Sequence, residues 1–393
     1  MRTVPLQQIC DIQIGKTPSR SVPEYWNGDM PWVAIRDFKA GRTVTTTKEG
    51  ITPIGAEKSG SKLIPKGTLL LSFKLSLGKR TFAGCDLFTN EAIAALQILD
   101  PYVADSDFLY WALGSIDYDR LVDRAAMGKT LNKAKLKILQ IPLPPLAEQK
   151  RIAGILDAAD KLRAKRRESL ARLDTLLQST FLDLFGDPVT NPMGWEFKPL
   201  AYGVESFEGG KNLTPTDIDR PDSVRVLKVS AVTSGEYRPD QSKAFSSEEI
   251  VQSSHMVKKG DLLISRANTA ALVGAVCHVW DTVGLEMLPD KLWRFIWNDS
   301  RRIEPLYMLH LARSDYFREQ LIQRATGTSG SMKNIGKKKM LEIPIPYPPL
   351  NLQHHFATIV ESVEQQKTSQ RAHLAELDTL FAALQQRAFN GEL

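Results

Sequence analysis

The sequence has few of the residues that cross-link small proteins or bind structural metals. Its 393 residues include three cysteines, Cys10, Cys85 and Cys277, which lie far apart and form no Cys-x-x-Cys pair. This spacing argues against a disulfide framework and against a cysteine-rich zinc site. The N-terminus lacks the continuous apolar core of a signal peptide, and no stretch approaches the ~20 apolar residues of a membrane span. We therefore expect a cytoplasmic protein that is not embedded in a membrane.

Catalytic motifs are also missing. Gly15-Lys16-Thr17 and Gly128-Lys129-Thr130 end like a phosphate-binding loop, but Cys10 and Asp123 stand where that loop requires its first glycine. The chain contains no Gly-x-Gly, so it has neither a dinucleotide fingerprint nor the common glycine-rich loop for S-adenosylmethionine. The Pro-Asp pairs are not followed by the lysine-bearing triplet of a nuclease, and the adjacent histidine pair cannot form a metal face on a helix. We expect no catalytic residue, metal or cofactor in this chain.

The charge balance is only slightly basic. Lys and Arg number 51 against 45 Asp and Glu, a formal net charge of +6, and 42% of the residues are hydrophobic. A surplus of this size permits a polyanionic partner without requiring one. The composition is that of an ordinary globular protein, and the length suits two or three domains or an internal repeat.

Several short segments occur once in each half of the chain. Residues 139–149, LQIPLPPLAEQ, match residues 341–353, LEIPIPYPPLNLQ, as if two residues had been added, and these segments hold the only two Pro-Pro pairs. The run Leu173-Asp174-Thr175-Leu176 recurs 204 residues later as Leu377-Asp378-Thr379-Leu380. A further set matches at a shift of 202, namely Gly128 with Gly330, Asn132 with Asn334 and Lys137 with Lys339. The two halves are therefore predicted to be homologous.

Each half consists of a mixed domain followed by a long helix. Short apolar runs between Gly and Pro turns indicate strands early in each domain, and residues 105–124 and 304–324 have the apolar period of helices. Each double proline marks the start of a long helix, because proline fits before or at a helix start but not inside one. We predict an α+β fold with four parts: a first domain at 1–145, a central helix at 146–187, a second domain at 188–349 and a C-terminal helix at 350–393.

The two long helices carry apolar residues at a seven-residue period. Roughly 38 residues make a rod of about 57 Å, longer than one small domain needs, so the two rods most simply pair with each other as a coiled coil. Basic residues crowd the first helix near Arg163, and acidic residues such as Asp378 lie on the second, which favours pairing weakly. Packing of each helix on its own domain is the alternative. The predicted contact positions are Ile152, Leu162, Leu173, Leu176, Ile359, Val363, Leu377 and Leu380.

The helical segments carry a family resemblance. Residues 142–187 resemble the central spacer region of the specificity subunits of type I restriction-modification systems, and residues 348–360 and 387–393 resemble their C-terminal spacer. The resemblance implies two target-recognition domains held apart by an antiparallel helix pair, each reading one half of an interrupted site in double-stranded DNA. It also implies a non-catalytic scaffold for two methylation subunits, which use S-adenosylmethionine, and for restriction subunits.

The candidate DNA contacts are basic and amide side chains in turn-rich segments of both halves. Gly15-Lys16 corresponds to Gly210-Lys211, and the loops 128–133 and 327–334 lead into further lysines. A lysine on a flexible loop can bind a phosphate, whereas base reading needs donors such as Arg or Asn. A solvated turn lysine is the alternative. The phosphate candidates are Lys16, Lys129, Lys133, Lys211, Lys333 and Lys337, and the base candidates are Arg36, Arg80, Arg266 and Asn268.

Two other functions account for parts of the sequence. A single-chain methyltransferase-nuclease would need the catalytic motifs that are missing. A coiled-coil scaffold that binds no DNA would explain the helices but not the duplicated lysine-rich loops. The sequence favours a DNA-specificity subunit over both alternatives.

Overall fold

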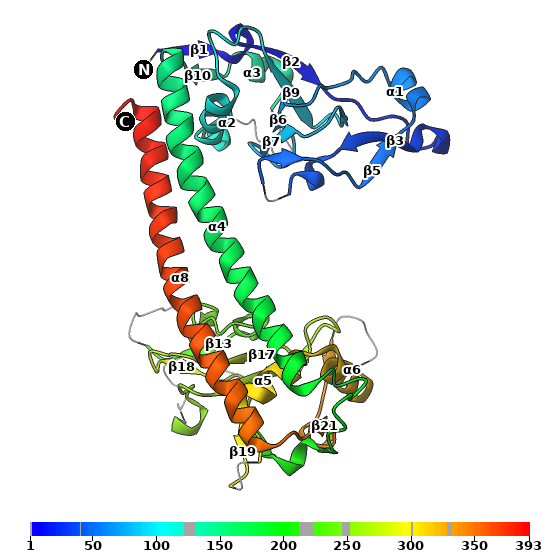
Figure 1. The fold of residues 1–393 in the computed structure, drawn as a ribbon, viewed down its shortest axis with the longest axis vertical. Helices are drawn as coiled ribbons and strands as arrows, with labels where there is room; N and C mark the ends of the chain where they lie inside the picture. Colours follow the sequence, from blue (N-terminus) through cyan, green and yellow to red (C-terminus); the bar gives the residue numbers. More distant parts are fainter. Residues whose placement is uncertain are drawn as a thin grey trace. The chain divides into compact units, whose positions relative to one another are not determined.

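The computed structural model describes residues 2–39, 41–121, 131–211, 223–245, 252–299, 302–327 and 332–393. The chain divides into two compact units, of which unit 1 contains Met1–Glu168 and Ala372–Leu393 and unit 2 contains Ser169–Arg371 (Figure 1). Each unit combines strands and short helices with part of both long helices, α4 (Leu146–Phe185) and α8 (Leu350–Asn390). The predicted α+β fold class is confirmed. The boundaries between the compact units fall inside both long helices, so they do not test the four sequential parts expected from the sequence. That division stays a prediction.

The core of unit 1 lies on both faces of its central strand, β6 (Leu69–Ser72). Its residues Leu69 and Leu71 pack with helix α2 (Ser106–Gly114), whereas Leu70 packs with Val33 on the opposite face. The leucines of this strand are therefore buried on both faces rather than alternating with polar residues. The described residues form a five-stranded sheet, a three-stranded sheet, the strand pair β1 (Thr3–Pro5) with β10 (Gln140–Pro142), and three helices. The strand order of the five-stranded sheet is β2 (Cys10–Ile14), β9 (Ile93–Ile98), β6 (Leu69–Ser72), β7 (Arg80–Ala83), β4 (Thr43–Val44). The strand order of the three-stranded sheet is β5 (Glu49–Ile51), β3 (Trp26–Val33), β8 (Phe88–Thr89). The helices are α1 (Pro53–Ser59), α2 (Ser106–Gly114) and α3 (Lys133–Lys137).

Unit 2 repeats this plan with a shorter main sheet. Its central strand, β15 (Leu262–Ser265), is fully buried, like β6. The described part of unit 2 has the main sheet β12 (Val204–Gly209), β19 (Leu292–Trp297), β15 (Leu262–Ser265), β17 (Val276–His278) and a second sheet β14 (Ser242–Lys243), β13 (Arg225–Leu227), β18 (Glu286–Met287). It also has the strand pairs β11 (Phe197–Pro199) with β21 (Pro344–Pro346) and β16 (Ala267–Asn268) with β20 (Lys333–Asn334), and the helices α5 (Pro305–Arg313), α6 (Asp315–Arg324) and α7 (Lys337–Leu341).

Equivalent hydrogen bonds correct the register of the repeat before the long helices. Leu6 donates its backbone N–H to Leu139 O at 2.8 Å, and Leu200 donates its N–H to Ile343 O at 2.8 Å. Leu139 therefore corresponds to Ile343, not to Leu341, and the shift is already 204 at this point. The expected pairs Asn132 with Asn334 and Lys137 with Lys339 were wrong, because α3 begins at Lys133 and α7 at Lys337, also a shift of 204. The expected pair Gly128 with Gly330 lies outside the described residues.

Within each unit, an equivalent ion pair joins α4 and α8. In unit 1, Arg163 Nε lies 2.6 Å from Asp378 Oδ1, and in unit 2, Lys367 Nζ lies 2.7 Å from Asp174 Oδ1. These pairs are equivalent at the shift of 204, and they show that the helices run antiparallel. The expected division into a basic and an acidic helix was too simple, since each helix contributes the cation of one equivalent pair and the anion of the other.

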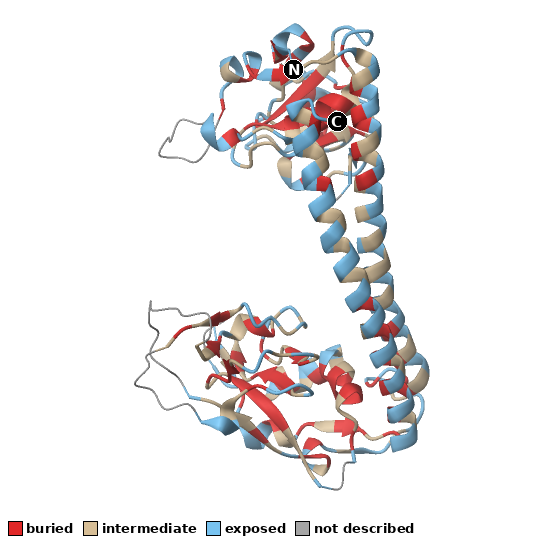
Figure 2. Cartoon of the chain, turned by 90° about the vertical axis from the view of Figure 1, so that its left-hand side faces the viewer, coloured by how far each residue is buried: buried red, intermediate tan, exposed pale blue. Residues whose placement is uncertain are grey.

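Fewer of the predicted contact positions on α4 and α8 are buried than the seven-residue apolar period indicated. Ile152 and Val363 are buried, and Leu173, Ile359 and Leu377 are partly buried. Leu162, Leu176 and Leu380 instead remain 54%, 49% and 50% exposed, so these three do not lie in the helix interface. One partner helix buries only one stripe, and Figure 2 shows exposed residues continuing along both helices. No helix in the described ranges is apolar and long enough to cross a membrane.

A fully buried glutamine fixes the start of each long helix. In unit 1, Gln149 Oε1 accepts from the N–H of Asp105 at 2.9 Å, and Gln149 Nε2 donates to Pro144 O at 2.8 Å. In unit 2, Gln353 makes the same bonds with Glu304 N–H and Pro348 O, at 2.9 and 2.8 Å. Asp105 and Glu304 are the N-caps of α2 and α5. One amide therefore joins two helix starts, and it satisfies backbone groups that would otherwise be buried without partners.

We expect Gln149→Met or Gln353→Met to lower the free energy of unfolding by about 2–4 kcal/mol, because each change keeps the side-chain volume but leaves at least two buried backbone groups unsatisfied. Chemical denaturation followed by circular dichroism measures the change. Gln365→Met, at an exposed position of α8, is the matched control and should have little effect. Equal effects of the buried and exposed substitutions would contradict this account.

Candidate nucleic-acid interface

Four candidate residues that are distant in sequence come together in unit 2. Strand β16 pairs with β20, which places Asn268 opposite Lys333. The N–H of Ile335 donates to Arg266 O at 3.0 Å, which brings the start of α7 and its first residue, Lys337, to the end of β15. The ends of two strands and the start of a short helix thus position basic and amide side chains on one surface.

Arg266 is held in a fixed orientation on this surface. Its Nε donates to the backbone oxygen of Asp290 at 2.7 Å, and its Nη1 donates to Asn334 Oδ1 at 2.9 Å. The guanidinium carbon lies 5.6 Å from the ring centre of Trp293, and Lys337 Nζ lies 5.7 Å from the same ring. A half-buried arginine with these contacts loses little further conformational freedom when it binds. Asp290, Trp293 and Asn334 were not among the sequence candidates.

The two Gly-Lys pairs are equivalent and owe their glycines to close backbone contact. A β-carbon on Gly15 would lie 2.3 Å from Thr89 O, and one on Gly210 would lie 1.6 Å from Leu288 O. These distances are far below van der Waals contact, so both positions require glycine. The lysines that follow, Lys16 and Lys211, are exposed, as expected for contacts to a phosphate.

In unit 1, Arg36 belongs to a cluster that the sequence did not reveal. Arg36 and Arg20 both bind the carboxylate of Glu49, and the Arg20 guanidinium lies 3.7 Å from the ring centre of Trp26. Hydrogen bonds from Arg20, followed by those from Arg36, hold the pKa of Glu49 below its usual value. The indole N–H of Trp32 donates to Lys16 O at 3.1 Å, which links this cluster to the Gly-Lys pair. The only feature of the sequence that could have indicated this cluster is the presence of two tryptophans, Trp26 and Trp32, close to basic residues.

The other candidates in unit 1 have different surroundings. Lys133 is exposed at the first position of α3, equivalent to Lys337 at the first position of α7. Lys129 lies outside the described residues. Arg80 packs against Tyr110, and a β-carbon on Gly114 would lie 1.9 Å from its Nη2. Burial lowers the pKa of Arg80. This packing directs Arg80 toward α2 and leaves it poorly placed to contact a base.

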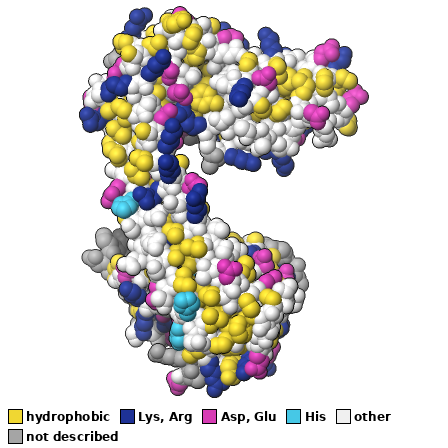
Figure 3. Space-filling model, in the orientation of Figure 1, with side chains coloured by type: hydrophobic (Ala, Val, Ile, Leu, Met, Phe, Trp, Pro, Cys, Tyr) yellow, Lys and Arg dark blue, Asp and Glu magenta, His cyan; other side chains and the backbone are white. Residues whose placement is uncertain are grey.

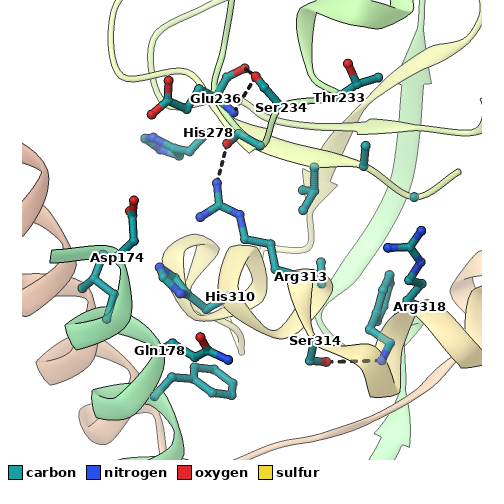
Figure 4. Close-up of a pocket in the computed structure, with 18 of the residues that line it drawn as sticks. Asp174, Gln178, Thr233, Ser234, Glu236, His278, His310, Arg313, Ser314 and Arg318 are labelled. Carbon is teal, nitrogen blue, oxygen red and sulfur yellow. Dashed lines mark hydrogen bonds between the residues drawn. The ribbon is translucent and has the colours of Figure 1, made fainter. Parts of the chain in front are cut away.

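Where Arg80 fills space in unit 1, unit 2 has a cavity of about 1100 Å³. Arg313, which replaces Gly114 at the equivalent position, extends across it and donates to Gly235 O between His278 and His310 (Figure 4). Burial lowers the pKa of His278 to about 4 and that of His310 to about 3, so both are neutral near pH 7. Within the described ranges, no group of three His, Cys, Asp or Glu side chains is placed to hold a metal ion.

Exposed basic side chains also occur on the part of α4 in unit 1. Lys161, Lys165 and Arg167 are exposed there, and Figure 3 shows Lys and Arg gathered along this helical segment. Arg167 lies 3.0 Å from Asp378, so part of the charge is neutralised. The remaining positive charge would attract a polyanion and suits contacts to phosphates more than sequence reading.

Comparison with known proteins points to one family. Residues 1–172 match the family described as the type I restriction modification DNA specificity domain. The chain is 27% identical over 233 residues to the MjaIX specificity subunit of Methanocaldococcus jannaschii, an alignment that covers 54% of this chain and 53% of that protein. It is 26% identical over 397 residues to the EcoKI specificity subunit of Escherichia coli K12, covering 93% and 82%. The chain thus spans about half the length of the first of these relatives and most of the second.

Solved structures share the fold along the whole chain. The S subunit of a type I restriction-modification system from M. genitalium superposes with a TM-score of 0.59 at 15% identity, covering 98% of this chain and 95% of that one. A chain from a structural study of complex assembly in the type I system gives a TM-score of 0.54 at 19% identity, covering 100% and 98%. The sequence and fold comparisons agree: the first 172 residues match the type I specificity domain family, and the whole chain is similar in sequence to type I specificity subunits and shares the fold of a solved S subunit.

Proposed function

We propose that this chain is the non-catalytic subunit that gives a type I restriction-modification system its DNA sequence specificity. Unit 1 and unit 2 each read one half of an interrupted site, with base contacts from side chains held at strand ends and phosphate contacts from exposed lysines. The observation that carries the proposal is the surface of unit 2 on which Arg266, Asn268, Lys333 and Lys337 come together. These residues span about seventy positions of the sequence, and a scaffold that binds no DNA would not require basic and amide side chains to gather on one surface.

The proposal assigns the chemistry to partner subunits. Two methylation subunits, which bind S-adenosylmethionine, and restriction subunits would assemble on this chain. The equivalent leucines Leu176 and Leu380, exposed at 49% and 50%, support a partner that binds twice, because the repeat presents the same apolar position in both units.

Methylation mapping of DNA from cells that contain the whole system tests the proposal. We expect modification at one interrupted sequence that changes when this chain is replaced by another specificity subunit. Methyl transfer by the purified chain alone with S-adenosylmethionine would favour a single-chain methyltransferase-nuclease. Salt-insensitive partner binding without DNA retention would favour a scaffold.

The equivalent lysines at the starts of α3 and α7 provide a test of phosphate binding. We expect Lys133→Ala with Lys337→Ala to weaken binding of the assembled methyltransferase to cognate and non-cognate duplexes alike. The slope of log affinity against log salt should fall by up to ~2, because the two substitutions remove one cation from each of two phosphates. Fluorescence anisotropy over a salt series measures both quantities.

Lys66→Ala with Lys259→Ala is the matched control. These exposed lysines occupy equivalent turns before β6 and β15, whereas the candidate surfaces follow the other ends of these strands. Reduced affinity for one sequence only in the Lys133 and Lys337 variant would contradict the phosphate assignment.

The long helices are proposed to set the gap between the half-sites. Inserting four residues after Ala171 adds roughly one helical turn, about 6 Å, to α4. We expect the reconstituted methyltransferase to keep both half-sites and accept a gap longer by about one or two base pairs, since each base pair rises about 3.4 Å. Methylation mapping reads out the gap. An unchanged gap with activity retained, or altered half-site letters, would show that the helices do not set the spacing.

A further inference from the structure

We propose that Arg36 reads a guanine in the half-site bound by unit 1, and that Glu49 is the residue that positions it, with Arg20 and Trp26 holding Glu49 in place. This inference rests on the proposed function and adds to it a specific base and the residues that select it. None of the residues Glu49, Arg20 and Trp26 was a candidate from the sequence.

The backbone that carries Arg36 is fixed from inside the unit. Arg36 is the middle residue of a short 3-10 helix, Ile35–Asp37. The Asp37 side chain, only 4% exposed, accepts from the N–H of Ala34 at 2.8 Å and from the N–H of Lys48 at 3.2 Å. The turn therefore cannot shift without breaking buried hydrogen bonds, while the Arg36 side chain, 47% exposed, points outward.

Glu49 holds the Arg36 guanidinium from one side. It begins β5 directly opposite Trp32 of β3, so its backbone position is set by strand pairing. Its Oε2 binds Arg36 Nη2. A contact through one nitrogen leaves the other edge of a guanidinium able to donate two parallel hydrogen bonds. Guanine offers the matching pair of acceptors, O6 and N7, in the major groove.

Arg20 and Trp26 fix Glu49 in turn. Arg20 binds both carboxylate oxygens of Glu49, at 2.5 and 3.2 Å, and its guanidinium carbon lies 3.7 Å from the ring centre of Trp26. The indole N–H of Trp26 donates to Ser19 O at 3.0 Å, which ties the ring to the loop that carries Arg20. One carboxylate between two guanidinium groups leaves a net positive charge, which suits a surface that meets DNA.

Base reading and phosphate binding by Arg36 predict different results. If Arg36 binds a phosphate, its replacement weakens binding to every duplex and reduces the salt dependence of binding. If Arg36 reads a base, its replacement weakens discrimination at one position and leaves the other positions unchanged. Lysine at position 36 keeps the charge but lacks the planar pair of donors, so Arg36→Lys separates the two roles.

The experiment uses the full chain reconstituted with its methylation subunits. Once methylation mapping has given the recognition sequence, duplexes with a single replacement at each position are titrated. We expect Arg36→Lys to reduce discrimination at one guanine of one half-site by roughly 5- to 150-fold, with the other half-site unchanged. The unchanged half-site shows that the variant is folded and assembled.

Glu49→Gln should reduce discrimination at the same guanine, since it removes the charge that orients Arg36. It should add little when combined with Arg36→Lys, because Glu49 acts through Arg36. Glu148→Gln is the matched control: Glu148 binds Arg151 at 2.7 Å on α4, and Arg151 holds its pKa below the usual value, but the pair lies away from the proposed site. This control should leave every position unchanged.

Several outcomes would overturn the inference. Uniformly weaker binding with a smaller salt slope in Arg36→Lys would make Arg36 a phosphate contact. Unchanged discrimination at every position, or a site with no guanine in either half, would remove the base assignment. In these cases the wild-type protein would still discriminate between sequences. Absence of any discrimination by the wild-type assembly would instead reject the proposed function.

Discussion

The antiparallel packing of α4 and α8 is the constraint on which both units depend. In unit 1, Phe389 near the end of α8 lies 5.8 Å, between ring centres, from Phe108 of α2. In unit 2, the equivalent Phe185 at the end of α4 lies 4.8 Å from Tyr307 of α5. Each domain core is thus completed by the end of one long helix and the start of the other. Neither domain buries its apolar surface with only the helix that directly follows it.

The reciprocal ion pairs select the antiparallel register more than they stabilise it. Asp378 is 43% exposed in its side chain, so its attraction to Arg163 is screened by water. Lys367 is different, because its side chain is only 7% exposed and binds both Asp174 and Glu364. A lysine buried to this degree needs both carboxylates, and a shift of one helix along the other would leave it unpaired. Apolar packing between α4 and α8 stabilises the helix pair, and the buried lysine selects the register of one helix against the other.

The two candidate DNA surfaces use the same physical device with different residues. Each has an arginine held by an acidic residue near an exposed Gly-Lys pair: Arg36 with Glu49 in unit 1, and Arg266 with Asp290 in unit 2. A tryptophan supports each pair differently, because Trp26 lies against Arg20, the second partner of Glu49, whereas Trp293 lies against Arg266 itself. An acidic side chain near DNA reduces affinity, but it fixes the direction of the guanidinium donors. Because these residues come from loops and strand ends, they can change without disturbing the buried strands β6 and β15.

The sequence by itself determined the local structure: the apolar runs of β6 and β15, the two long helices after the double prolines, and the repeated Leu-Asp-Thr-Leu segment. These follow from residue periodicity and from the geometry of proline, which act over a few residues. Only the tertiary structure decided the register of the repeat, the exposure of Leu162, Leu176 and Leu380, and the partners of the arginines. Glu49 could not be assigned to Arg36, nor Asp290 to Arg266, because strand pairing brings these side chains together and the sequence does not state which strands pair. Arg80 and Arg36 have the same chemistry in the sequence, and only the tertiary structure shows that Arg80 is buried against α2 while the Arg36 side chain is half exposed.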